Sequence, residues 1–218
     1  MSISDSITRF KNDLPDHVEL VAVSKTKPIS DLQEAYDAGQ RVFGENKIQE
    51  MTQKWEQLPK DIKWHMIGHV QTNKVKYMAP YVSLVHAVDR IKLLKEIDKQ
   101  ARNNDRIIEV LIQVKIAEED SKFGMEEAAV IALFENNTLD AFPNVRVKGL
   151  MGMATFTDDK VQIGNEFKKL SYLYERFRES AMLSILSCGM SGDYDIAIAH
   201  GSTMIRVGSA IFGARNYK

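Results

Sequence analysis

The amino-acid sequence predicts a single-domain α/β protein in which eight parallel strands close into a (β/α)8 barrel, the TIM-barrel fold. Short apolar segments with strand character alternate with amphipathic helical segments at intervals of roughly 20–40 residues. No low-complexity linker divides the 218 residues, so we expect one domain over residues 1–218. Alternation of this kind implies parallel strands joined by right-handed crossovers. Eight repeats favour a closed barrel over an open doubly wound sheet, which remains the alternative.

The predicted strands are short apolar runs that end in polar or glycine-rich sequence. The first, residues 18–25, is rich in β-branched residues and ends at Lys25. Residues 106–114 combine a continuous apolar run with partial alternation, which is typical of a buried strand. No Gly-x-Gly-x-x-Gly motif follows the first strand, which weakens the case for a dinucleotide fold. The eight predicted strands cover residues 18–25, 41–44, 64–68, 84–88, 106–114, 145–153, 185–190 and 203–207.

The predicted helices follow the strands in turn. An amphipathic helix over about residues 1–14 comes first, and we expect it to pack on the barrel. Ser30 is expected to cap the helix over residues 30–38, which ends at Gly39. Residues 161–182 carry apolar side chains at helical spacing. The helices after the first strand are predicted over residues 30–38, 46–56, 72–79, 90–102, 125–136, 161–182 and 194–199.

Composition excludes several classes of function. The net charge of −1 gives no electrostatic basis for binding nucleic acid or an anionic membrane. No run is as long as a transmembrane helix, and the amino terminus lacks the features of a signal peptide. The single cysteine, Cys188, cannot form an intramolecular disulfide or a zinc site, and we expect no metal. A cytoplasmic location is the resulting expectation.

Lys25 is the first candidate functional residue. It stands at the carboxyl end of the first strand, the edge where parallel α/β folds bind ligands and barrels place their active sites. The alternative is that its side chain extends to solvent as the strand leaves the core. Position alone does not decide between the two interpretations.

The last two strands carry a second group of candidates. Ser191 follows the seventh strand, Thr203 begins the eighth, and Gly208 and Ser209 follow it. Glycine and hydroxyl residues after these strands are what a barrel phosphate site requires, because backbone amides must approach the anion closely. They could equally be ordinary turn residues. Since strands eight and one are neighbours in a closed barrel, a phosphate held here would lie within a small molecule's length of Lys25.

A phosphate site beside a lysine indicates a phosphorylated carbonyl compound bound as a Schiff base. Pyridoxal 5′-phosphate (PLP) fits this description, and so does a sugar phosphate in an aldolase. Arg206 stands two residues before Gly208, so its side chain should point to the same side. PLP sites place a carboxylate or an arginine opposite the pyridine nitrogen. An arginine there disfavours protonation of that nitrogen and weakens the ring as an electron sink.

Several stretches resemble the pyridoxal phosphate homeostasis protein family, whose single domain is related to the barrel half of alanine racemase, a PLP enzyme of fold type III. They span nearly the whole chain in order, and the last one is long enough to be specific. The matching stretches are VAVSK ending at Lys25, FGENKIQE at 43–50, WHMIGHVQTNK at 64–74, SKFG at 121–124, GLMGM at 149–153 and LSCGMSGDYDIAIAHGSTMIRVGSAIFGAR at 186–215.

The resemblance implies a role for each candidate. Lys25 would carry PLP as a Schiff base, Asn46 would lie near the ring, and Arg206 would face the pyridine nitrogen. The phosphate would be bound by Ser191, Gly208 and Ser209, with Thr203 as a further candidate. The family is linked to vitamin B6 and amino-acid homeostasis without an established reaction, so PLP-dependent apoenzymes are the candidate recipients.

Two alternatives to a non-catalytic PLP carrier stay open, an amino-acid racemase of low activity and a Schiff-base aldolase. Racemisation needs a base on each face of the substrate, and the sequence offers Lys25 but no evident second base. His65, His69, His86 and His200 are interpreted as structural, and Glu45 as either part of the site edge or a solvated loop charge. No helix shows an exposed apolar seam, which favours a monomer.

Overall fold

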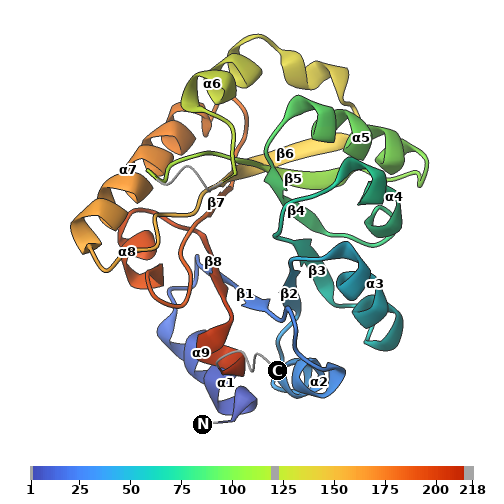
Figure 1. Ribbon diagram of the computed structural model, residues 1–218, viewed down its shortest axis with the longest axis vertical. Coiled ribbons are helices and arrows are strands. Elements are labelled where there is room, and N and C mark those ends of the chain that lie inside the picture. The colour runs from blue at the N-terminus through green and yellow to red at the C-terminus, as the bar shows by residue number, and fades with distance from the viewer. Residues whose placement is uncertain (1, 119–122, 214–218) are drawn as a thin grey trace.

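The computed structural model describes residues 2–118 and 123–213. Its eight parallel strands pair in sequence order, and β8 pairs with β1, so the sheet is a closed barrel. Figure 1 shows the helices arranged around the outside of these strands. The predicted (β/α)8 fold is confirmed. The strands are β1 (Glu19–Val23), β2 (Val42–Glu45), β3 (Lys63–Met66), β4 (Leu84–Val88), β5 (Ile108–Gln113), β6 (Val145–Met151), β7 (Ile185–Ser187) and β8 (Met204–Val207).

The helices follow the predicted order with shifted ends. The segment predicted as one helix over residues 72–79 is a 3-10 turn followed by a single α-turn, and two short helical segments were not predicted (η2 and α9). The helices are α1 (Ile3–Asp13), α2 (Ile29–Asp37), α3 (Ile48–Gln57), η1 (Thr72–Lys74), α4 (Val75–Met78), α5 (Ile91–Arg102), α6 (Glu127–Glu135), η2 (Thr138–Ala141), α7 (Lys160–Phe177), α8 (Tyr194–Ala199) and α9 (Ser209–Phe212).

The predicted cap of the second helix is wrong. Helix α2 begins at Ile29, so Pro28 occupies the N-cap position and Ser30 already lies within the first turn. Pro28 has φ of −69° and ψ of 161°, an extended backbone that its ring permits, and no side-chain hydrogen bond caps the helix. A serine hydroxyl is therefore not what begins this helix.

The amino-terminal helix α1 is stabilised at its start by a capping box. The Ser2 hydroxyl accepts from the Asp5 amide, and the Asp5 carboxylate accepts from the Ser2 amide, each at 3.0 Å. Ile7 and Phe10 are buried on its inner face, and the Phe10 ring meets Tyr194 edge to face with centroids 5.6 Å apart. This helix packs beside α2 and α9, next to the seam between β1 and β8 (Figure 1).

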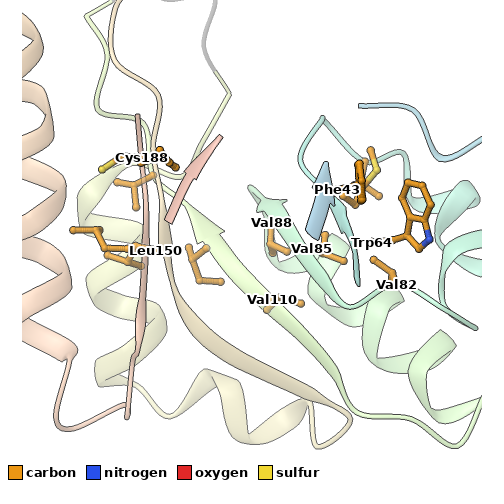
Figure 2. Packing of buried hydrophobic residues seen from close by; sticks show 14 of the residues in the cluster. Phe43, Trp64, Val82, Val85, Val88, Val110, Leu150 and Cys188 are labelled. Carbon is orange, nitrogen blue, oxygen red and sulfur yellow. The ribbon is translucent and has the colours of Figure 1, made fainter. Parts of the chain in front are cut away.

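Apolar side chains form two layers because successive strand residues point to opposite faces. A small inner cluster fills the barrel, and a much larger outer cluster lies between strands and helices; Figure 2 shows part of the outer cluster, including Phe43, Trp64 and Leu150. Cys188 is fully buried in the outer cluster. The inner cluster consists of Val21, Val42, Leu84, Ala87, Leu111, Met151 and Met204.

Candidate functional site

A cavity of about 700 Å³ lies at the carboxyl ends of the strands. The loops after β1, β2, β3, β6, β7 and β8 all contribute to its lining, as a barrel active-site face requires. It brings together residues as far apart in sequence as Val23 and Gly213. Six of the seven residues that the sequence singled out line this one cavity: Lys25, Asn46, Ser191, Arg206, Gly208 and Ser209.

Lys25 enters the cavity from the turn after β1. The strand ends at Val23, two residues earlier than the sequence suggested, so Lys25 belongs to the turn rather than to the strand. The turn is closed by the Lys27 amide, which donates to the Ser24 carbonyl at 3.1 Å. Strand β1 pairs with β8 in the register Val21 to Arg206 and Ala22 to Val207. Lys25 therefore lies beside the loop that leaves β8.

The loop after β8 provides the group of anion-binding candidates. The Gly208 amide donates to the Ser191 hydroxyl at 3.3 Å, which joins the β7 and β8 loops. A Cβ at Gly208 would lie 3.2 Å from the Val23 carbonyl oxygen, tighter than most such contacts, so the backbone of β8 approaches that of β1 closely. Peptide amides at residues 208–210 and the hydroxyls of Ser191 and Ser209 are suitable donors for a phosphate.

Arg206 lies deeper, on the floor of the cavity. Its side chain is 4% exposed, and burial lowers the pKa of the guanidinium, although arginine stays charged in proteins. Nη1 donates to the Ser187 hydroxyl at 2.6 Å and Nη2 to the Gly152 carbonyl at 3.0 Å. These two hydrogen bonds fix the orientation of the planar Arg206 guanidinium, which lines the same cavity as Lys25.

A chain of hydrogen bonds runs from Arg206 across the barrel interior. The Ser187 hydroxyl lies 3.2 Å from His86 Nδ1, and His86 Nε2 lies 3.1 Å from His65 Nδ1. If Ser187 accepts from Arg206 and donates to His86, each imidazole needs one donor and one acceptor nitrogen, which is the neutral form. The sequence interpretation treated these histidines as structural and missed that they connect to Arg206. Strand alternation places all four residues of this hydrogen-bonded chain on the inward face of the barrel, and this pattern in the sequence could have identified the chain.

Burial keeps both histidines neutral. It lowers the pKa of His65 from 6.5 to about 3 and that of His86 well below 6.5, with Arg206 adding to the effect on His86. An unfolded chain takes up these protons near pH 6.5, while folded His65 does so only near pH 3. The unfolded state is therefore favoured as pH falls through this window, and stability is lost there.

We expect the free energy of unfolding to reflect this difference in proton uptake. Each histidine should remove about 1.4 kcal/mol per pH unit as pH falls below 6.5. His65→Asn keeps an acceptor near the position of Nδ1 but does not titrate, so its stability should fall less steeply. Urea unfolding at a series of pH values from 7 to 4 measures the difference. Parallel curves for the two proteins would contradict the neutral, buried assignment.

The wall of the cavity formed by the β5 and β6 loops is held by Glu166. This α7 side chain is 1% exposed, and its carboxylate accepts from the Thr155 amide at 2.6 Å, the Thr155 hydroxyl at 2.7 Å and the Glu118 amide at 3.2 Å. Thr155 lines the cavity together with Phe156. One buried carboxylate thus connects two loops of the site.

Replacing Glu166 with alanine should destabilise the fold by about 2 kcal/mol or more, because the Thr155 amide and hydroxyl both lose their acceptor. Glu166→Gln keeps one oxygen that can accept hydrogen bonds, so it should lose less stability. Urea unfolding of both variants checks the order. Equal stability of the alanine and wild-type proteins would contradict this role for Glu166.

Thr203 does not come together with the other predicted residues. It stands just before β8, at the amino end of the strand, whereas Gly208 and Ser209 follow the carboxyl end. Its hydroxyl accepts from the Leu186 amide at 2.9 Å. The side chain therefore joins β7 to β8 at the opposite end of the barrel from the cavity.

The remaining candidates have defined places. His69 lies at the cavity rim, where Nδ1 is 2.9 Å from Asp89 Oδ2 and the ring stacks on Phe123. Glu45 is fully buried and bonded to Lys54, so its interpretation as a solvated charge is wrong. In residues 2–118 and 123–213 no three His, Cys, Asp or Glu side chains gather as metal ligands. The predicted stretches include Ser121, Lys122, Ala214 and Arg215, which lie outside the described residues.

The cavity fits a small phosphorylated aldehyde. It has an amine at one side, hydroxyl and amide donors at the next loop, and a buried cation on its floor, all in about 700 Å³. A lysine amine can form a Schiff base with an aldehyde, and the donors after β7 and β8 can take the phosphate. The residues present therefore fit PLP.

The barrel is closed, a lysine follows its first strand, and hydroxyl and amide groups suited to a phosphate follow its last two strands. This is the architecture of a PLP-binding barrel. The model of the alanine racemase N-terminal domain matches residues 2–216. The pyridoxal phosphate homeostasis protein of Vibrio alginolyticus is 41% identical over 209 residues, covering 93% of this chain and 89% of the relative. The Aquifex aeolicus protein of that name is 40% identical over 202 residues, covering 91% and 88%.

Solved structures that resemble this chain are consistent with these sequence matches. PipY of Synechococcus elongatus with PLP bound has a TM-score of 0.88 at 32% identity, covering 97% of this chain and all of PipY. Alanine racemase of E. faecalis has a TM-score of 0.75 at 15% identity, covering 98% of this chain but 58% of the racemase, and shows the shared fold alone. The chain belongs to the alanine racemase N-terminal domain family and, within it, to the pyridoxal phosphate homeostasis proteins.

Proposed function

We propose that this protein binds PLP as a Schiff base on Lys25 and takes part in intracellular PLP and amino-acid homeostasis. The observation that carries the proposal is the convergence of Lys25, Arg206 and the Ser191–Gly208 pair on one cavity. The 41% identity to a pyridoxal phosphate homeostasis protein and the PLP bound to PipY support the same ligand.

Each residue of the site has a distinct task. Bound PLP supplies an aldehyde that links reversibly to an amine and a ring that can accept electron density. Lys25 supplies the amine, which must be neutral to act as the nucleophile. Ser191, Gly208 and Ser209 bind the phosphate, and Asn46 lies near the ring. Arg206 faces the pyridine nitrogen and, being permanently charged, keeps a proton off it.

A carrier role follows from the weak catalytic equipment of this site. An unprotonated pyridine is a poor electron sink, and racemisation also needs a base on each face of the substrate. Among the described residues that line the cavity there is no tyrosine, and we assign Lys25 alone as a base toward the ligand. The amino-acid racemase is the second candidate, supported by the shared fold, and the Schiff-base aldolase the third.

Partners and location belong to the same proposal. PLP-dependent apoenzymes are the recipients that a carrier would serve, and the protein would act as a monomer in the cytoplasm. The buried Cys188 thiol, whose pKa burial raises to about 11, is compatible with a reducing compartment. Within the described ranges, none of the helices has the length and apolar character that a membrane crossing demands.

Mass spectrometry of the purified protein after borohydride reduction tests the proposal. We expect PLP to be found on the peptide that contains Lys25. Incubation with L-amino acids in deuterated water separates a carrier from a racemase, because only a racemase exchanges the α-proton rapidly. Cleavage of sugar phosphates without added PLP would instead support the aldolase. A reduced protein that carries nothing on Lys25 would overturn the proposal.

A further inference from the structure

The turn that carries Lys25 has an unusual backbone. Thr26, the next residue, has φ of +65°, in the left-handed region that glycine adopts freely and β-branched residues almost never do. It occupies the third position of the turn from Ser24 to Lys27, where a positive φ normally selects glycine. Such a residue persists only when its surroundings hold it, and such residues gather at functional sites.

Both neighbours of Lys25 are held by one group of charged side chains outside the barrel. The Thr26 amide donates to Glu50 Oε1 at 2.5 Å. The Ser24 hydroxyl donates to Glu45 Oε1 at 2.6 Å, and Lys54 Nζ donates to the Ser24 carbonyl at 2.8 Å. Residues of β2 and α3 therefore form hydrogen bonds with the turn on each side of Lys25.

The three charged residues also bind one another. Lys54 Nζ lies 2.7 Å from Glu45 Oε1 and 2.7 Å from Glu50 Oε1. The side chains of Glu45 and Lys54 are 0% and 6% exposed, and burial raises the pKa of the Glu45 carboxyl, with Lys54 opposing that effect. Burying an ion pair costs desolvation, and apolar residues of similar volume often stabilise a fold at least as well. Stability alone therefore does not account for a charged cluster at this position.

We propose that Glu45, Glu50 and Lys54 form a positioning cluster that holds the strained turn so that the Lys25 amine is aimed into the cavity. This inference rests on the proposed Schiff base with PLP. In that step the neutral amine adds to the aldehyde carbon, a C=N bond replaces C=O, and the oxygen leaves as water with the two amine protons. The geometry of attack depends on where the turn places Lys25, and misplacement of about 1 Å can cost up to a hundredfold in rate.

Glu50→Ala is the sharpest test because it removes the acceptor of the Thr26 amide and leaves the Lys54–Glu45 pair. We expect the rate of Schiff base formation with PLP, followed by absorbance, to fall about tenfold. Affinity for 4′-deoxypyridoxine 5′-phosphate, which has the ring and phosphate but no aldehyde, should stay within about twofold, because its contacts come from other loops. Amide hydrogen exchange at Thr26 in the PLP-free protein should become faster.

Two variants complete the design. Glu50→Gln keeps an oxygen that can accept from Thr26, so it should restore most of the rate. Glu135→Ala breaks the Arg176–Glu135 ion pair between α6 and α7 and serves as the matched control, because neither residue lines the cavity. It should react with PLP as the wild-type protein does.

The outcomes are distinguishable. An unchanged rate in Glu50→Ala, or unchanged exchange at Thr26, would overturn the positioning role and leave the proposed function intact. Equal losses of Schiff base formation and of analogue binding would show that the cluster only supports the fold, which also overturns it. A wild-type protein that forms no Schiff base with PLP would instead remove the proposed function, and this inference with it.

Discussion

Lys25→Ala should abolish the borohydride-reducible adduct with PLP while the protein stays folded. Lys25 lies in a turn at the edge of the cavity rather than in the core, so its loss removes a reactive amine and little packing. The groups proposed to bind the phosphate are on the β7 and β8 loops and remain in place. We therefore expect 4′-deoxypyridoxine 5′-phosphate to bind the variant with wild-type affinity, although PLP itself no longer becomes attached.

Absorption spectra and mass spectrometry after reduction measure the loss, and urea unfolding confirms the fold. Lys25→Arg keeps the positive charge without the nucleophilic amine and should lose the adduct equally, which separates chemistry from electrostatics. Lys95→Ala, on the exposed face of α5, is the control for removing a lysine. A reducible adduct that persists at full stoichiometry in Lys25→Ala would show that another lysine carries the ligand.

Gly149→Ala should produce the largest loss of stability. Gly149 lies in β6 at a register irregularity against β5, where Lys148 is an extra residue between two paired positions. A Cβ on Gly149 would overlap the carbonyl oxygen of Ile185 in the neighbouring strand. Because the obstacle is backbone inside a closed barrel, it cannot be relieved by a side-chain rotation. We expect the free energy of unfolding to fall by about 3 kcal/mol or more.

Gly192→Ala provides the matched control. A Cβ there would meet nothing within 4 Å, so the stability should change by no more than about 0.5 kcal/mol. Urea unfolding of both variants at one pH measures the contrast. A Gly149→Ala protein with wild-type stability would mean that β6 and β7 can separate locally without cost, contrary to their paired register of Gly149 to Ile185.

The repeating pattern of the sequence was sufficient for the fold and for much of the site. Alternation of strands and helices implies parallel strands, and parallel strands place all their carboxyl ends on one face of the barrel. The identity of the neighbours at the seam, β1 and β8, then follows from closure alone. This is why Lys25 and Gly208 could be assigned to one site although they lie far apart in sequence.

Strand direction and side-chain contacts explain what was missed. Thr203 was grouped with Gly208 because both are near β8, but they lie at opposite ends of that strand. Glu45 was read as a possible solvated charge, yet it points away from the barrel interior into a buried contact with Lys54 on α3. Neither result is visible in a local window of sequence, since each depends on which element packs beside the residue.

By itself the sequence determined the barrel, the lysine after its first strand and the glycine and hydroxyl groups after its last two, because periodicity and turn chemistry are local properties. Only the tertiary structure decided how these parts are held. The link from Arg206 to His65 crosses the barrel, and the contacts of Glu50 and Lys54 with the Lys25 turn join segments more than 20 residues apart. Such contacts depend on how helices pack on strands and which rotamers result, and no repeat in the chain encodes them.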